Sequence, residues 1–217
     1  SGTSDDPYQI ETLEHLQTLS AYGDYETQGY TADTMQHFMS AHYKQIADID
    51  AEPAAGEEDS DGFGTGFQPI GTSESETYFT GSYDGNGYTI SNLTMTREEQ
   101  SGVGLFGFVA DTVQSSDAIF KNITLKNVSI IGRHSVGGIF GRYDRYGATG
   151  DQGNVVIRNA RVTGTVKGED GVGGLAGSAI KIEDSSTDCS VTGTRGVGGL
   201  VGSLFAKLAE DNETVVT

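Results

Sequence analysis

Few side chains of this 217-residue chain stand at a spacing that supports chemistry. Tyr143-Asp144-Arg145-Tyr146 groups two aromatic rings with one acid and one base. Aromatic faces stack on sugars and fill pockets of protein partners. We therefore take these four residues as a candidate binding loop, with a plain surface loop as the alternative.

A turn around Asp84-Gly85-Asn86-Gly87 is the second candidate. Oxygen-rich acidic turns suit Ca²⁺, which prefers hard oxygen ligands. The same Asn-Gly pair, placed between β-rich runs at 79–83 and 88–90, is also the strongest short signal for a hairpin. We expect a hairpin turn, keep Ca²⁺ as the alternative, and predict no other cofactor.

The histidines and the single cysteine predict no metal site. His37 and His42 are five residues apart, which places them on different faces of a helix, and His15 and His134 have no ligand spacing. Cys189 is the one cysteine of the chain, so it forms no internal disulfide. Within an apolar strand pattern it is expected to be a small buried residue.

A recurring glycine signature indicates which elements position these residues. It reads Val-Gly-Leu-Phe-Gly at 103–107, and then Val-Gly-Gly-Ile-Phe-Gly at 136–141, Val-Gly-Gly-Leu-Ala-Gly at 172–177 and Val-Gly-Gly-Leu-Val-Gly at 197–202. Its first residues are 33, 36 and 25 positions apart, so 25 residues is the bare repeat and the longer steps carry insertions. Units that cannot bury an apolar face alone must stack on copies of themselves.

The stretches between signatures alternate apolar and small polar residues, which is typical of strands with one buried face. They lie at 123–132, 160–168 and 188–193. We predict an all-β fold with short N-terminal helices, a right-handed parallel β-solenoid with about two or three strands per coil. Positive φ and close backbone approach should require glycine at the corners. The expected structural glycines are Gly107, Gly137, Gly138, Gly141, Gly173, Gly174, Gly177, Gly198, Gly199 and Gly202.

The N-terminal third has a different pattern. We predict a capping region at 1–66 and repeats at 67–217, packed as one continuous body. Within the cap we expect helices at 10–21 and 32–42, a strand at 43–50 and an exposed acidic loop at 51–66. Helices there would cover the open sheet edges of the first coil.

The chain has 31 acidic and 13 basic residues, a formal net charge of −18. This charge argues against nucleic acid and anionic membrane as partners. No stretch has the apolar length needed for membrane insertion. The excess of acidic over basic residues is typical of a protein adapted to concentrated salt, where screening suppresses the repulsion between carboxylates. An ordinary acidic surface protein is the alternative.

Two further features concern modification and assembly. Sequons at Asn92, Asn122, Asn127 and Asn212 could carry N-linked glycans, although Asn and Thr are also common residues of solenoid turns. The tail Thr214-Val215-Val216-Thr217 has strong β propensity and is a candidate assembly strand. It could add to a neighbour's sheet and build an end-to-end filament, or it could belong to a longer repeat array.

Several motifs together resemble the GLUG-repeat family of secreted and cell-surface β-solenoid proteins. They include Asp6-Pro-Tyr-Gln-Ile10, Gln45-Ile-Ala-Asp-Ile-Asp50, Phe67-Gln-Pro-Ile-Gly71, Asp84-Gly-Asn-Gly-Tyr-Thr-Ile90 and Gly104-Leu-Phe-Gly107, followed by the Val-Gly-Gly repeats. The insertion between 24 and 43 and the acidic loop depart from the family pattern. The resemblance implies an extracellular location and, with the charge, a haloarchaeal source.

The same resemblance implies a non-catalytic structural or adhesion module. Its partners would be copies of itself, or other cell-surface proteins and glycans. Polysaccharide-processing β-helices need acids converging on one groove across successive coils, whereas the strand-facing positions here are Thr, Ser, Asn and Val. Such an enzyme is one alternative, and an ancillary repeat domain of a larger surface peptidase is another.

Overall fold

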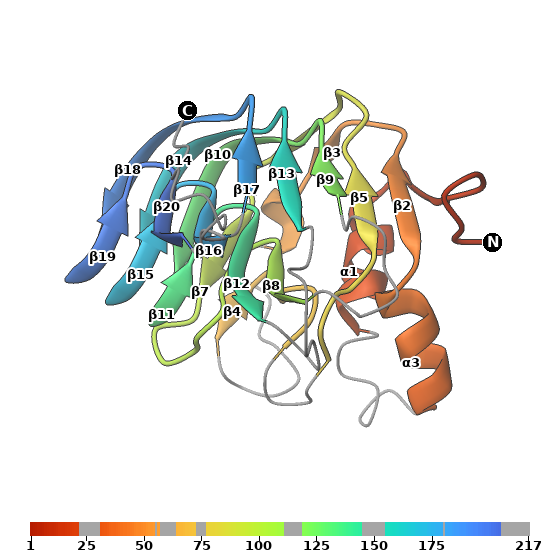
Figure 1. Ribbon diagram of the computed structural model, residues 1–217, viewed down its shortest axis with the longest axis horizontal. Coiled ribbons are helices and arrows are strands. Elements are labelled where there is room, and N and C mark those ends of the chain that lie inside the picture. Colours follow the sequence, from red (N-terminus) through yellow and green to blue (C-terminus); the bar gives the residue numbers. More distant parts are fainter. Residues whose placement is uncertain are drawn as a thin grey trace, which may run out of the picture.

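A computed structural model describes residues 1–21, 31–54, 56, 64–72, 77–110, 119–144, 155–179 and 181–204. The protein is mainly β with two short helices, and its strands form several stacked parallel sheets (Figure 1). The chain colour in Figure 1 changes steadily from one end of the stack to the other. Each turn of the chain therefore lies on the preceding turn, in a solenoid-like arrangement.

One coil, residues 119–144, shows the repeating unit. It contains β9 (Ile119–Lys121), β10 (Thr124–Ile131), β11 (His134–Val136) and β12 (Phe140–Asp144), and each strand belongs to a different sheet. The expectation of two or three strands per coil was wrong. The glycine signature is not only a corner, because 136–141 includes the end of β11 and the start of β12.

The sheets of the described residues are parallel apart from one short edge pairing between named strands. The first is β1 (Tyr8–Ile10), β2 (His42–Gln45), β5 (Ser82–Asp84), β9, β13 (Val156–Arg158) and β17 (Lys181–Glu183). The second is β3 (Ile49–Asp50), β6 (Thr89–Ser91), β7 (Thr94–Thr96), β10, β14 (Arg161–Lys167) and β18 (Ser186–Thr192), with β4 (Thr65–Gly66) antiparallel to β7. The third is β11, β15 (Asp170–Gly173) and β19 (Arg195–Gly198), and the fourth is β8 (Phe106–Ala110), β12, β16 (Ala176–Ala179) and β20 (Val201–Leu204).

The core is built from columns of apolar side chains that the parallel register places one above another. Tyr43, Tyr83, Phe120 and Ile157 form one such column, and each is at most 5% exposed. Phe106 packs against Phe120 with ring centroids 4.9 Å apart. Each coil thus buries its apolar face against the coils on either side, as the repeat pattern predicts.

The insertions all fall at one corner of the coil. Eight residues, 111–118, separate β8 from β9, and eleven, 145–155, separate β12 from β13. Residue 180 alone separates β16 from β17. These insertions leave the strand stack in register, apart from a shift between β10 and β14 at Leu125 and Val128, where β10 has one extra residue.

The N-terminal segment contributes both strands and helices. The helix expected at 10–21 is α1 (Leu13–Ala21), and it begins later because residues 8–10 form β1 beside β2. The second is α3 (Ala32–Met39), capped by the Thr31 hydroxyl, which accepts from the Thr34 backbone N–H. Both helices lie at the N-terminal end of the stack (Figure 1). Within the described residues, no helix combines the length and the apolar run needed to span a membrane.

Two other local expectations were wrong for the same reason. The strand expected at 43–50 is split into β2 and β3, which belong to different sheets. The hairpin expected around Asn86-Gly87 is a corner, because β5 pairs with β2 and β9 while β6 pairs with β3 and β10. The turn itself is present, with φ of 53° at Asn86 and 82° at Gly87. In a solenoid, a turn joins two sheets rather than two neighbouring strands.

The acidic loop expected at 51–66 lies partly outside the described residues. Its described parts are residues 51–54, with a 3-10 turn at Glu52–Ala54, residue 56 and the segment from residue 64, which leads into β4. Ala51 and Ala54 are buried in the core, so the expected exposure is wrong at these two residues.

The signature glycines allow close approach of successive coils. A Cβ added at Gly104 would lie 2.7 Å from the carbonyl oxygen of Gly137, and one at Gly138 would lie 2.7 Å from that of Gly174. One added at Gly174 would lie 2.5 Å from the carbonyl oxygen of Gly199. At Gly199 itself, an added Cβ would meet no described atom within 4 Å.

Positive φ, by contrast, is the wrong reason for the expected structural glycines, none of which adopts it. The left-handed residue is the one before the signature valine, namely Gly102, Ser135, Gly171 or Gly196, with φ between 54° and 71°. The other corners are left-handed mainly at asparagine, which tolerates this region better than other non-glycine residues. The signature glycines are therefore required by the space between coils.

We predict opposite outcomes for the same substitution in two successive coils. Gly174→Ala should destabilise the protein by about 3 kcal/mol, because backbone of the next coil must move. Gly199→Ala should change the stability by less than about 0.5 kcal/mol, because the space beside Gly199 is open. Urea unfolding of both variants would check this, and equal losses would contradict it.

Candidate functional site

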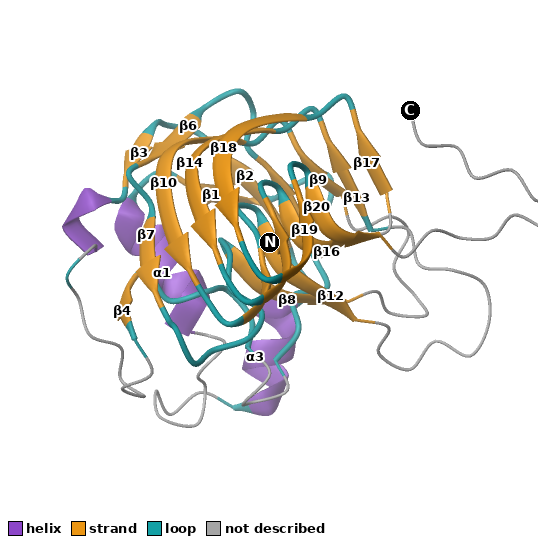
Figure 2. Cartoon of the chain, turned by 90° about the vertical axis from the view of Figure 1, so that its left-hand side faces the viewer, coloured by secondary structure: helices purple, strands orange, loops and turns teal. Residues whose placement is uncertain are grey.

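The last described coil presents an uncovered end of the stack. Its strands β17, β18, β19 and β20 each lie at the edge of their sheet. Figure 2 views the stack from this end. Unpaired strand edges are templates for pairing with another chain, and here four of them face the same way.

The side chains of this coil continue the core columns but are exposed. Val172 is 0% exposed whereas its register partner Val197 is 46% exposed. Ala179 is 0% exposed and its partner Leu204 is 43% exposed. Together with Leu200 at 41%, Val197 and Leu204 are the exposed large apolar residues of the described chain.

Backbone hydrogen bonds show what a further coil would supply. In the signature, the N–H of one coil donates to a carbonyl of the next. Ile139 donates to Leu175 over 2.7 Å, and Leu175 donates to Leu200 over 2.9 Å. The N–H of Leu200 stands at the same place in the last described coil, where the described chain supplies no following carbonyl. The end is thus shaped to accept a coil with the same backbone pattern.

Half of the expected binding loop, Tyr143 and Asp144, lies within the described residues. Tyr143 is 4% exposed and packs in the core, so its ring cannot stack on a ligand, which corrects the sequence interpretation. The Asp144 carboxylate pairs with Arg142 at 3.3 Å. Arg145 and Tyr146 lie outside the described residues.

Two asparagine ladders run along corners of the stack. In one, the Asn122 amide donates to Asp84 over 2.9 Å, and the Asn159 amide donates to Asn122 over 2.8 Å. In the other, Asn92 donates to Asp50 over 2.9 Å and Asn127 donates to Asn92 over 2.7 Å. The bonds join each coil to the one before it.

Three of the four sequon asparagines belong to these ladders. The Nδ2 atom that a glycan would modify in Asn92, Asn122 or Asn127 is already the donor of a ladder bond. All three residues have φ between 54° and 58°, which asparagine adopts more readily than other non-glycine residues. Their structural use accounts for their presence without a glycan. Asn212 and the tail Thr214–Thr217 lie outside the described residues.

Asp84, the residue considered for Ca²⁺, is occupied by protein partners. Its carboxylate accepts bonds from the Asn122 side chain and the Asn86 backbone N–H, and it pairs with Lys121 at 3.4 Å. Partial burial opposes ionisation, but these bonds and the Lys121 charge hold the pKa of Asp84 below its usual value. Among the described residues, no group of three or more His, Cys, Asp or Glu side chains could hold a metal ion.

The remaining candidate groups are dispersed. The Nε2 atom of His37 lies 3.0 Å from the Tyr8 hydroxyl, and Nδ1 of His15 accepts from the Glu11 N–H over 3.1 Å. Cys189 is half-buried on β18, and burial raises the pKa of its thiol. His15 and the Tyr8 partner of His37 line the same small hollow near the N-terminus, whereas Cys189 lies on β18 in the last described coil.

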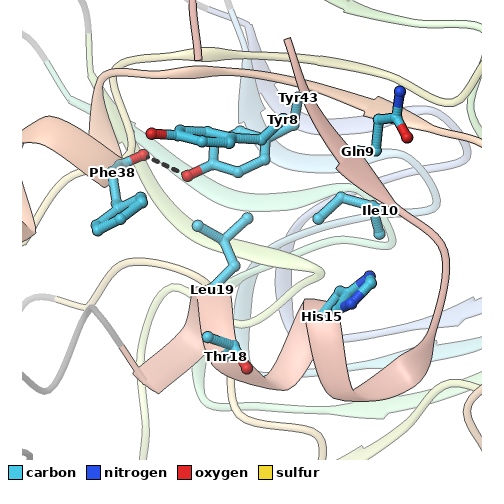
Figure 3. A pocket seen from close by; sticks show the side chains of 8 residues that line it. All are labelled: Tyr8, Gln9, Ile10, His15, Thr18, Leu19, Phe38 and Tyr43. Atoms are coloured by element: carbon cyan, nitrogen blue, oxygen red, sulfur yellow. Dashed lines mark hydrogen bonds between the residues drawn. The ribbon is translucent and has the colours of Figure 1, made fainter. Parts of the chain in front are cut away.

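Two hollows near the N-terminal coils were missed by the sequence analysis. A small one of about 150 Å³ lies between β1 and the helices, where the Tyr8 and Tyr43 rings lie side by side and Leu19 closes it from α1 (Figure 3). A larger groove of about 720 Å³ lies over the outer face of β2, β5 and β9, beside residues 4–7. The alternation of His42 and Lys44 around buried Tyr43 was the available signal for this outward face.

The comparisons with known proteins agree with a surface-type repeat fold. Over 179 residues, 82% of this chain, the sequence is 36% identical to halomucin of Haloquadratum walsbyi. The chain is a distant homologue of that protein. It spans 2% of halomucin's length. No protein-family model matches the chain, so the resemblance to the GLUG-repeat family stays a prediction.

Two further likenesses are weaker. A candidate Gly-rich membrane protein of Evansella cellulosilytica is 28% identical over 149 residues, which are 62% of this chain and 15% of that protein. A solved structure described as a candidate immunoglobulin A1 protease from Bacteroides ovatus has a TM-score of 0.57 at 18% identity. It covers 94% of this chain and 64% of that one, and at this identity the likeness concerns the fold alone.

We predict that Asn122 contributes to stability through its ladder hydrogen bond and not through a glycan at its sequon. Asn122→Asp keeps the size of the side chain but replaces the donor to Asp84 with a second carboxylate. It should cost about 1–3 kcal/mol at neutral pH, measured by urea unfolding. Thr124→Val removes the same sequon without touching the ladder and should cost less than about 0.5 kcal/mol. A loss for Thr124→Val as large as for Asn122→Asp, in a glycosylating host, would contradict this.

The lowered pKa of Asp84 predicts a pH dependence. Because its pKa is lower in the folded than in the unfolded chain, ionised Asp84 stabilises the fold above the unfolded value, and this stabilisation is lost as pH falls through the folded value. The melting temperatures of wild type and Asp84→Asn should therefore converge on acidification. Thr124→Val, which leaves every carboxylate in place, is the control, and its difference from wild type should not change with pH.

Proposed function

We propose that this chain is a non-catalytic structural module of an extracellular protein, a right-handed β-solenoid that extends by coil stacking. In this proposal its uncovered end binds a further coil of the same repeat chemistry, supplied by a copy of itself or by another surface protein. Repeated at successive ends, such a contact would build a filament or an adhesive surface layer.

The uncovered last coil carries the proposal. Its exposed Val197, Leu200 and Leu204 continue columns that are fully buried one coil earlier. Among the described residues, no strand lies beyond β17, β18, β19 or β20 in their four sheets. Apolar surface that is buried in every earlier coil favours association when left open.

The ion pairs formed by acidic residues of the six-stranded sheet support a structural rather than a catalytic role. Asp84 pairs with Lys121, and Glu183 pairs with both Arg158 and Lys181 at 2.6 Å. These ion pairs and the ladder bonds lower the pKa of both carboxyl groups, which disfavours a general acid of near-neutral pKa. Both acids act instead as links between or within coils.

An extracellular and salt-adapted setting is supported by charge and homology. The homologue halomucin is named as a mucin, and the second relative is named as a membrane protein. With 31 acids against 13 bases, repulsion within the chain is weakest in concentrated salt. We therefore place the stacking contact in a saline extracellular medium, where apolar coil faces associate without opposition from net charge.

Gly199→Ala tests the stacking contact without disturbing the chain itself. Within the described part of the chain, an added Cβ at Gly199 meets nothing within 4 Å, whereas the equivalent atom at Gly174 meets the next coil. In molar salt we expect wild type to associate with rising concentration and Gly199→Ala to remain monomeric, by analytical ultracentrifugation.

Lys126→Gln, on an exposed position of β10, is the matched control and should associate like wild type. A wild-type chain that stays monomeric at high concentration would contradict self-association. Equal association of Gly199→Ala and wild type would contradict the assigned contact surface.

A further inference from the structure

The groove over the outer face of the six-stranded sheet contains a cation that forms no ion pair with any described residue. Register aligns Gln9, Lys44, Asp84 and Lys121 in one outward column. Lys121 pairs with Asp84 at 3.4 Å. Lys44 is half-buried and lines the groove, yet it has no ion pair among the described residues. This is notable in a chain with 31 acidic residues.

The adjacent carboxylate is directed to other partners. Asp84 is the register neighbour of Lys44, but its Oδ2 pairs with Lys121 and its Oδ1 accepts from Asn122 and from the Asn86 N–H. These bonds tie Asp84 to the following coil and to its own turn. The Lys44 ammonium is therefore left for an anion from outside the fold.

Neighbouring groups add neutral and acidic hydrogen-bonding partners. His42 precedes Lys44 on the same outward face, and its Nδ1 is bonded to the Ser82 hydroxyl, which leaves Nε2 for a ligand. Gln9 and Asp5 line the same groove of about 720 Å³. This volume lies within the range of small-molecule sites, about 300–1,000 Å³.

We propose that this groove binds an acidic saccharide, with the carboxylate of a uronic acid residue on Lys44. Hydroxyls of the sugar donate to Asp5 and exchange hydrogen bonds with Gln9 and with Nε2 of His42. Ile119 and Pro7 provide apolar surface for the C–H faces of the ring. The site lies at the N-terminal end of the stack, so it is independent of the coil-stacking contact.

The mixed charge of the groove favours a saccharide over an acidic peptide. One unpaired ammonium matches one carboxylate, whereas Asp5 and Asp6 on the groove wall would repel a run of carboxylates. A polyhydroxylated ligand instead uses carboxylates as acceptors for its hydroxyl donors. The groove therefore combines a group for one acid with groups for several alcohols.

A matched pair of disaccharides tests the site. Cellobiouronate and cellobiose differ only in that the uronate carries a carboxylate where cellobiose carries a hydroxymethyl group. NMR titration of the full chain should show about tenfold tighter binding of cellobiouronate, since a charge-assisted hydrogen bond is stronger than a neutral one. The shifted amide signals should cluster at Gln9, His42 and Lys44.

Substitutions of Lys44 test whether its ammonium group binds the uronate carboxylate. Lys44→Gln should abolish the preference for the uronate and leave the melting temperature unchanged, because the Lys44 side chain has no ion pair with a described residue to lose. Lys44→Arg should keep the preference, and Lys126→Gln, on another sheet, should bind like wild type. Equal binding of both disaccharides, or an equal effect of Lys126→Gln, would overturn the proposal. Tighter binding of tetraglutamate than of cellobiouronate at the same residues would assign the groove to an acidic peptide instead.

Discussion

The structure depends on the distance between successive coils at the glycine signature. There, the backbone of one coil lies so close to the backbone of the next that a single added methyl carbon at Gly138 would lie 2.7 Å from a carbonyl oxygen. This approach permits the direct hydrogen bonds from one coil to the next, such as that from Ile139 to Leu175. It also brings the apolar columns into contact, so that Val136 and Val172 are both fully buried. Without glycine at this place, successive coils could not approach closely enough to form these backbone hydrogen bonds or to pack the apolar columns against each other.

The same constraint explains why the two ends of the stack differ. At the N-terminal end, α1 and α3 bring Leu16, Leu19 and Met39 into the core. At the other end, the last described coil has the glycine signature, the apolar residues and the backbone donors of a middle coil, but lacks a following coil among the described residues. In the proposed function, this coil is both a structural element and the surface that binds a further coil. The open end and the fold are thus consequences of one repeat.

Much of the stack could be predicted from the sequence because each coil repeats the same pattern of glycine, apolar and small polar residues. The strands expected at 123–132 and 160–168 are β10 and β14, since alternating apolar residues report one buried face. The course of the chain at the corners was predicted wrongly. Asn86-Gly87 specifies a turn, but local sequence cannot say whether the strands on either side pair with each other or with neighbouring coils. The prediction of Tyr143 as a binding residue was wrong for a similar reason. An aromatic residue next to charged residues suggests an exposed position, but the strand register places Tyr143 in the core. Lys44 could not be singled out, because its lack of a partner depends on how Asp84 is bonded.

Amide hydrogen exchange measured residue by residue in the monomer tests the central claim most directly. The N–H groups of Leu175 and Leu200 occupy equivalent positions of the signature, and Leu175 donates to the following coil over 2.9 Å. If each coil is completed by its neighbour, Leu175 should exchange slowly and Leu200 rapidly in dilute protein, and Leu200 should gain protection when the protein associates. Equal and strong protection of both amides in the monomer would contradict the account, because it would mean that the last coil is closed without a further coil.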